Sequence, residues 1–162
     1  MQKITKAIFP VASVASQVVN FIFSLVPLCL FMVAIGARFN WSLLWLPIPL
    51  LSLTGFAMGI ALLLGTCNVF FRDVKYFYEA GVLAWFYATP IFYPAEIIPD
   101  QFKFLLYINP MYPLLETLRA PLYRATAPPA DLLILGLAIS VFTLLLGWSV
   151  FHRFEARFIH YV

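Results

Sequence analysis

The stretch RDVKYFYEAGVLAWFYATPIFYP, residues 72–94, lies between long apolar runs and combines three features in order. It opens on a compact charge cluster, continues as an uncharged run to residue 95, and contains the proline and aromatic exit PIFYP at 90–94. The charged residues are Arg72, Asp73, Lys75 and Glu79. This order predicts that the stretch carries the chain from one membrane face to the other and then into a bent, partly embedded hairpin.

The composition requires lipid as the solvent for most of the chain. The 162 residues are 64% hydrophobic and only 10% charged. A soluble domain carries roughly a quarter charged residues, so this chain cannot cover itself with a polar surface. The net charge of +3 is small and no basic block occurs, so no nucleic-acid partner is expected. Cys29 and Cys67 lack CxxC or Cys/His spacing, so neither a disulfide nor a metal site is indicated.

The uncharged runs predict an all-α membrane protein with four transmembrane helices. About 20 apolar residues cross a bilayer, so the third span has to include Glu79, because the run 80–95 alone is too short. The predicted spans lie near 16–36, 43–69, 75–93 and 132–151. The first apolar run, which follows a basic lead within residues 1–15, is too long for the core of a secretory signal, so we expect a retained span.

Residues 94–130 differ from the spans because seven prolines divide them into short pieces. The apolar piece 104–115 is only a dozen residues long, which suits a re-entrant or interfacial element better than a span. We expect two short helices, near 100–108 and 111–123. They would form a Pro-broken re-entrant hairpin between the third and fourth transmembrane helices.

Four spans put both termini on the same side of the membrane. That side would hold Lys3, Lys6, Arg72, Lys75, Arg153 and Arg157, and the other side Arg38, Lys103, Arg119 and Arg124. Lys and Arg near span ends favour the cytoplasmic side. We therefore expect the lead and the tail 152–162 in the cytoplasm and the hairpin 94–130 outside.

No catalytic or nucleotide-binding motif occurs in the sequence. GxxxxGK[ST], HExxH, GxSxG and clustered metal ligands are all absent, so we expect neither an enzyme nor a bound cofactor. Glu79 comes nearest to an intramembrane carboxylate. It either faces a polar pathway or pairs with Lys75 four residues earlier, and the ion pair is favoured.

Small residues favour close helix packing in two of the predicted spans. Gly55 and Gly59 form a GxxxG pattern, which we interpret as ordinary packing. The last span carries small residues that are placed to face a partner helix, namely Gly136, Ser140, Thr143 and Gly147.

Aromatic residues, 18% of the chain, form a periodic stripe in the opening stretch. Tyr78, Trp85 and Phe92 recur every seven residues, which predicts that they share one helix face. Such a face can stack against sugar rings, although aromatic residues also populate membrane interfaces and packed positions. Arg72 and Asp73 at the span entrance form either a structural ion pair or a docking point for a soluble partner.

Four short motifs occur in an order that resembles the second half of an ABC-2-type membrane permease. They are Lys6-Ala-Ile-Phe-Pro10, Arg72-Asp-Val74, Pro90-Ile-Phe-Tyr-Pro94 and Asn109-Pro-Met111, followed by a final span with a basic tail. The chain looks most like the branch that exports O-antigen, capsular or teichoic-acid polymers on a lipid carrier. The motifs cover nearly the whole chain, and their order is more specific than any one of them.

The resemblance implies an exporter in the bacterial inner membrane with two permease copies and two ATP-binding cassette subunits, which hydrolyse ATP. Its substrate would be a lipid-linked polysaccharide. The resemblance implies ATPase docking at Lys3, Lys6, Phe9, Pro10, Arg72 and Asp73. It implies a substrate path along Tyr78, Glu79, Trp85, Phe92 and Tyr93. It implies an external gate at Pro94, Pro99, Asn109 and Pro110.

One departure from the family concerns length. Family members have six spans, whereas this chain begins where their third span is about to start, so we expect a fragment, a split-gene half or a misassigned start. Two alternatives to a transporter subunit stay open. One is a non-transporting remnant or assembly factor. The other is a small membrane transferase acting on lipid-linked sugars, for which the outer-face candidates would be Glu116, Arg119 and Arg124.

Overall fold

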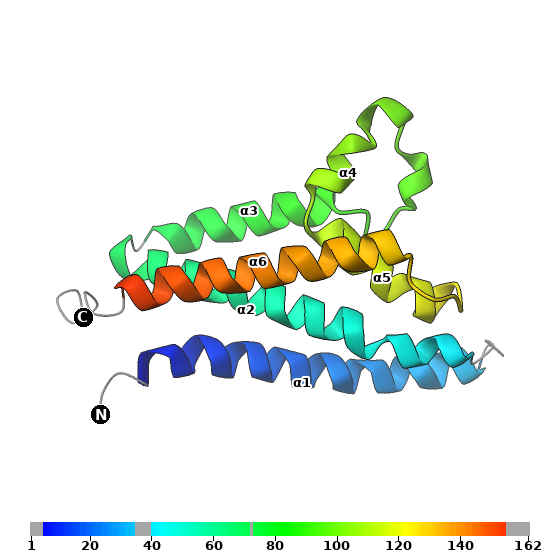
Figure 1. Cartoon of the computed structure of the whole chain (residues 1–162), viewed down its shortest axis with the longest axis horizontal. Helices are drawn as coiled ribbons and strands as arrows, with labels where there is room; N and C mark the ends of the chain where they lie inside the picture. Colours follow the sequence, from blue (N-terminus) through cyan, green and yellow to red (C-terminus); the bar gives the residue numbers. More distant parts are fainter. Residues whose placement is uncertain (1–4, 35–39, 72, 155–162) are drawn as a thin grey trace.

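The computed structural model describes residues 5–34, 40–71 and 73–154, and all regular structure in these ranges is helical (Figure 1). Three helices are long and apolar enough to cross a membrane: Val11–Ala34, Trp41–Phe70 and Ala130–Phe154. The described part of the chain is therefore an all-α membrane protein, as predicted. The three long helices have mean hydropathies of 2.0 to 2.3, which is typical of segments whose solvent is lipid.

Helix α1, Thr5–Ala34, contains the first predicted span but begins well before residue 16. The helix thus includes part of the predicted lead and continues through Pro10. A proline in the second turn removes only one intrahelical hydrogen bond, which a long apolar helix can tolerate. The most apolar stretch of α1 contains no buried residue, although Val14 near the start of the membrane-length part is buried, and α1 packs mainly against α2.

Helix α2, Pro47–Phe70, follows a short 3-10 helix, η1, at Trp41–Trp45. The Asn40 side chain caps η1 by accepting a hydrogen bond from the Trp41 N–H. The prolines at 47 and 49 lie in the first turns of α2, where missing amide donors cost least.

Helix α6, Ala130–Phe154, packs along α2 and forms the central pair of the fold. A Cβ on Gly59 would meet the backbone of Thr143, and a Cβ on Gly147 would meet the backbone of Gly59. The small-residue face predicted for the last span is therefore confirmed, and its partner is α2 of the same chain except at Gly136, which faces α5. Close backbone approach of this kind is the usual basis of helix association in lipid.

Helix α3, Val74–Ala88, is shorter than the span predicted at 75–93. Its 15 residues are about 22 Å long, short of the roughly 30 Å hydrocarbon core. Thr89 is the C-cap, and Pro90 cannot continue the hydrogen-bonding pattern, so the helix ends before the aromatic exit. Helix α3 is thus not among the three helices of membrane length.

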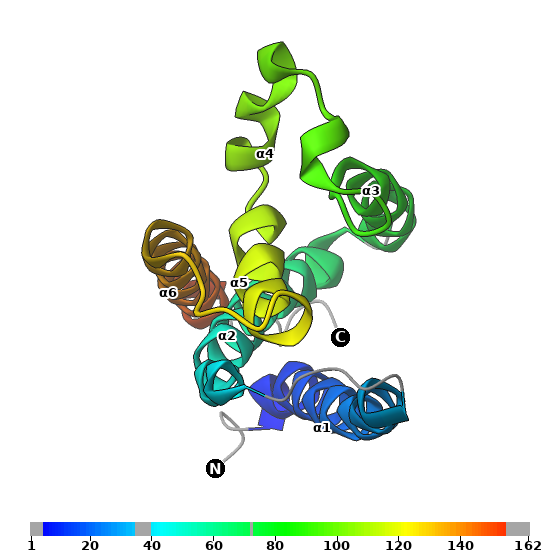
Figure 2. The same cartoon turned by 90° about the vertical axis from the view of Figure 1, so that its right-hand side faces the viewer.

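The Pro-rich segment contains the predicted short helices. Two 3-10 turns, η2 (Ala95–Ile97) and η3 (Asp100–Phe102), lead into α4 (Phe104–Ile108), and α5 (Met111–Tyr123) follows at once. Figure 2 shows α4 projecting away from the bundle while α5 lies back beside α2 and α6. We call residues 89–123 the hairpin and residues 85–91 with 109–119 the hairpin base.

The two ends of the bundle carry different parts of the chain (Figure 1). The starts of α1 and α3 and the ends of α2 and α6 lie together at one end. The starts of α2 and α6 and the end of α5 lie together at the other. A surface formed by the beginnings of both α1 and α3 therefore lies at a single end of the molecule.

Candidate functional site

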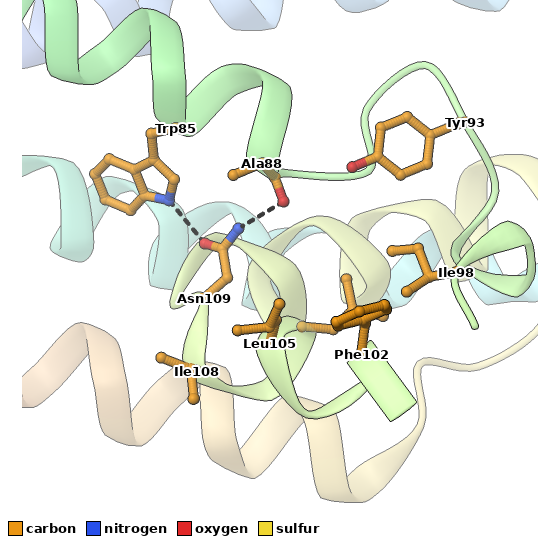
Figure 3. A pocket seen from close by; sticks show the side chains of 9 residues that line it. Trp85, Ala88, Tyr93, Ile98, Phe102, Leu105, Ile108 and Asn109 are labelled. Atoms are coloured by element: carbon orange, nitrogen blue, oxygen red, sulfur yellow. Dashed lines mark hydrogen bonds between the residues drawn. The ribbon is translucent and has the colours of Figure 1, made fainter. Parts of the chain in front are cut away.

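Asn109, in the turn between α4 and α5, joins the hairpin to the end of α3. Its Oδ1 accepts hydrogen bonds from Trp85 Nε1 at 2.7 Å and from the Met111 N–H at 3.0 Å (Figure 3). Its Nδ2 donates to Thr89 Oγ1 at 2.9 Å and to the Ala88 carbonyl at 3.5 Å. Both ends of the amide are thus used, which is what a polar side chain in an apolar setting requires.

Trp85 and Thr89 extend this connection into the bundle. The Trp85 ring lies edge-on to Phe56 of α2, with centroids 6.0 Å apart. Thr89 is buried and donates its hydroxyl proton to the Trp85 carbonyl at 2.8 Å. The end of α3 is therefore tied to α2 on one side and to the hairpin on the other.

A second polar cluster lies on α5. Glu116 is only 4% exposed, and each of its oxygens accepts a hydrogen bond from an arginine. Arg119 Nη1 donates to Oε1 at 3.1 Å, and Arg124 Nη2 donates to Oε2 at 2.8 Å. Arg119 Nη2 also donates to the Ile91 carbonyl at 2.6 Å. A buried carboxylate is costly without such partners, and here the pairing also ties α5 to the segment that leaves α3.

The two polar clusters together hold the two segments of the hairpin base, residues 85–91 and 109–119. Asn109 binds residues 85, 88 and 89, and Arg119 binds residue 91. Each contact joins segments 20 or more positions apart in the sequence. The end of α3 and the hairpin are therefore joined by side-chain hydrogen bonds at two places.

A cleft of about 460 Å³ lies between the end of α3, the segment that contains Tyr93 and Ile98, and α4 (Figure 3). Its walls include Trp85, Tyr93, Phe102 and Leu105. The polar atoms at its base are already engaged, since Trp85 Nε1 binds Asn109 and the Tyr93 hydroxyl donates to the Tyr87 carbonyl at 3.1 Å. The surface that the cleft offers is consequently aromatic and aliphatic.

The aromatic stripe predicted for one helix face is not continuous. Because α3 ends at Ala88, Phe92 lies beyond the helix, highly exposed, with its ring against Phe86. Trp85 is half-buried in the hairpin base, whereas Tyr78 is exposed on α3. The prediction that the three share a helix face is wrong, because Pro90 ends the helix first.

The remaining path candidate, Glu79, is exposed on α3. Its Oε1 lies 4.0 Å from Lys75 Nζ, at the outer limit of an ion pair, and both side chains are largely exposed. This is the interfacial helix pair that the spacing favoured.

The docking candidates lie only partly within the described residues. Lys3 and Arg72 fall outside them, and Lys6, Phe9 and Pro10 are described only as positions within α1. Asp73 is exposed and is the N-cap of α3, without a capping bond from its side chain. The starts of α1 and α3 lie at the same end of the bundle (Figure 1).

The prolines among the gate candidates each precede a short helix. Pro94, Pro99 and Pro110 are the N-caps of η2, η3 and α5. They separate the hairpin into rigid pieces, while Asn109 holds its base. Asp100 and Lys103 pair at 2.6 Å on its exposed part, and this hydrogen bond and the ammonium charge lower the pKa of the Asp100 carboxyl.

Sequence reasoning missed Thr89 and the joint role of Glu116, Arg119 and Arg124. The three charged residues do converge, as a transferase site would require. However, Glu116 is saturated by the two arginines, and no group of three potential metal ligands occurs in the described residues. The i, i+3 spacing of Glu116 and Arg119 was the signal available, whereas the contact with residue 91 has no sequence signature.

Long apolar helices, a small-residue α2–α6 interface and a hydrogen-bonded hairpin define an integral membrane protein of the multi-helix class. The profile of the ABC-2 type transporter family matches residues 4–123, and the chain belongs to that family. This confirms the resemblance drawn from the four motifs.

Curated relatives show which members of the family this chain is similar to. The chain is 30% identical over 152 residues to the O-antigen export system permease protein RfbA of Myxococcus xanthus. It is 27% identical over 154 residues to a protein of the same name from Klebsiella pneumoniae. These matches cover 93% and 94% of this chain but only 57% and 59% of the relatives. The chain thus spans about three-fifths of the length of the relatives it matches.

Proposed function

We propose that this chain is a membrane-spanning permease subunit of an ATP-driven exporter that moves a lipid-linked cell-surface polysaccharide across the bacterial inner membrane. The observation that carries the proposal is the family match over residues 4–123, together with relatives named as O-antigen export permeases. The chain would supply the pathway, and a separate ATP-binding cassette subunit would hydrolyse ATP.

The proposed assembly contains two permease copies and two ATPase subunits. Docking would involve Asp73 and the start of α1, whose shared end of the bundle supports a single contact surface. Both termini would be cytoplasmic. Helix α3 would make the third of four crossings together with the non-helical residues 89–94 that follow it.

The hairpin is the proposed external gate. Because Asn109 and Arg119 tie the hairpin base to the end of α3, a tilt of α3 driven by the ATPase would displace the hairpin with it. Tyr78 and Glu79, exposed on α3, and the aromatic cleft beside Tyr93 would line the substrate path. Aromatic walls give a sugar chain stacking surfaces without strong directional binding.

The test is co-expression with a candidate ATP-binding cassette subunit, with and without an upstream two-span segment. After purification in mild detergent, we expect the ATPase to be retained and retention to fall with Arg72→Ala and Asp73→Ala. Asp100→Ala is the matched control, because Asp100 is equally exposed but lies in the hairpin. Loss of the ATPase in every combination, or an equal effect of all three substitutions, contradicts docking at this surface and leaves the remnant interpretation.

A further inference from the structure

The end of α5 lies at the level where two membrane-length helices begin. Leu114, near the start of α5, contacts Gly136, and six positions separate Gly136 from Ala130, a rise of about 9 Å along α6. From there α5 runs toward the start of α6 (Figure 1). The Asn40 side chain, just before the apolar stretch Trp41–Phe70, donates to the Ala125 carbonyl at 3.1 Å. Residues 123–126 are therefore at interfacial depth.

Exposed aromatic residues support this depth. Trp41 is 83% exposed and Tyr123 is 75% exposed, and both adjoin the link between Asn40 and Ala125. Trp and Tyr with exposed rings gather where the hydrocarbon core meets the lipid headgroups. The phosphates of the bilayer lie at that same level.

The polar cluster at this depth carries an uncompensated positive charge. One carboxylate, Glu116, faces two guanidinium groups, which leaves a net charge of +1. Among the described residues no other carboxylate pairs with them, although Asp131 is close in sequence. A fixed positive charge at headgroup depth attracts an anion.

The two arginines differ in what they can still bind. The Arg119 side chain is 19% exposed and directs one nitrogen at Glu116 and another at the Ile91 carbonyl. The Arg124 side chain is 50% exposed and uses only Nη2, on Glu116. Since a guanidinium has five N–H donors, the half-exposed Arg124 retains donors beyond the one that Glu116 accepts, while Glu116 holds the group in one orientation.

We propose that Arg124, oriented by Glu116, binds the phosphoryl group of a membrane lipid. A guanidinium held in this way matches phosphate in geometry and charge, and the contact needs no movement of the hairpin base. The site goes beyond the proposed transport function, since a phospholipid headgroup and the diphosphate of a lipid-linked glycan offer the same chemistry.

The experiment measures lipid retention by the full chain in detergent with native mass spectrometry. The probes are phosphatidylglycerol, a polyprenyl diphosphate and a neutral diacyl glycolipid without phosphate. We expect both phosphate lipids to bind better than the glycolipid, and Arg124→Gln to weaken their binding about tenfold. Lys103→Gln, which removes an exposed cation in the hairpin, should leave binding unchanged. The phosphate lipid that the chain retains more strongly identifies the source of the phosphoryl group.

A labelling measurement on the unaltered chain covers the case in which Arg124→Gln does not fold. Phenylglyoxal modifies exposed arginines, and phosphatidylglycerol or polyprenyl diphosphate should protect Arg124 whereas the glycolipid should not. Equal retention of the glycolipid, undiminished binding by Arg124→Gln, or labelling of Arg124 that no phosphate lipid slows would overturn the proposal. None of these readouts needs the ATPase, so their failure is separate from failure of the transporter assignment.

Discussion

Asn109 is the single side chain with the most connections in the hairpin base. Its amide serves a tryptophan, a threonine and two backbone groups, and three of the four hydrogen bonds are partly buried. Asn109→Ala removes the bonds and leaves the partly buried Trp85 N–H without its acceptor. We expect the free energy of unfolding to fall by about 2 kcal/mol, because an orphaned polar group adds its desolvation cost to the lost bonds.

Thermal unfolding in detergent measures this loss. Asn68→Ala is the matched control, since Asn68 is exposed near the end of α2, and it should change stability little. An Asn109→Ala chain as stable as the control would mean that the hairpin is held by packing alone.

Ala125 offers a gain in stability at one residue. It has a positive φ of 51°, in the left-handed region that costs an L-residue roughly 1 kcal/mol, and it follows the C-cap of α5. Ala125→Gly should raise the free energy of unfolding by up to about 1 kcal/mol, because glycine adopts this conformation without strain.

The same unfolding measurement tests this expectation. Ala127→Gly is the comparison, because Ala127 has no positive φ and the substitution only adds freedom to the unfolded chain. If the Ala125→Gly variant is no more stable than the Ala127→Gly variant, strain at Ala125 is absent.

At the scale of elements, the α2–α6 interface depends on glycine. Gly147→Ala would drive a methyl group into the backbone of Gly59, and a backbone cannot give way as a side chain can. We expect a loss of about 2–3 kcal/mol or failure of the two helices to pack. Gly81→Ala on α3 is the control. Nothing lies within 4 Å of a Cβ added at Gly81, so stability should be unchanged or higher by up to about 1 kcal/mol.

Unfolding in detergent by increasing dodecyl sulfate, followed by circular dichroism, would compare the two glycine variants. Similar stability of Gly147→Ala and Gly81→Ala would argue against the close approach of α2 and α6.

The elements also show what sequence patterns can predict. Length and hydropathy predicted α1, α2 and α6, because crossing lipid demands both and little else. The short helices after Pro99 and Pro110 were predicted because the prolines divide this segment into short pieces. The end of α3 was predicted too late, since the need for a full span was given more weight than Pro90. Contacts such as Trp85 with Asn109 were not predictable, because periodicity identifies a helix face but not its partner.

At the scale of the whole molecule, the membrane topology depends on whether α3 crosses. Helix α6 is long and apolar enough to cross the membrane. Ala127, just before its start, and Arg153, near its end, should therefore face opposite sides. If α3 and residues 89–94 also cross, Asp73 and Asp100 are on opposite sides as well. If α3 instead lies along one interface, the two aspartates share a side.

Single cysteines and a membrane-impermeant maleimide distinguish these topologies. Cys29 and Cys67 are both exposed and are first replaced by Ala and Ser. Cysteines then introduced at Ala127 and Arg153 calibrate which side is accessible from outside in intact cells. We expect Asp100→Cys to label with Ala127→Cys, and Asp73→Cys to label only after the cells are opened, as Arg153→Cys does. Labelling of Asp73→Cys in intact cells together with Asp100→Cys would contradict a crossing by α3. It would also remove Asp73 from any surface that a cytoplasmic ATPase can reach.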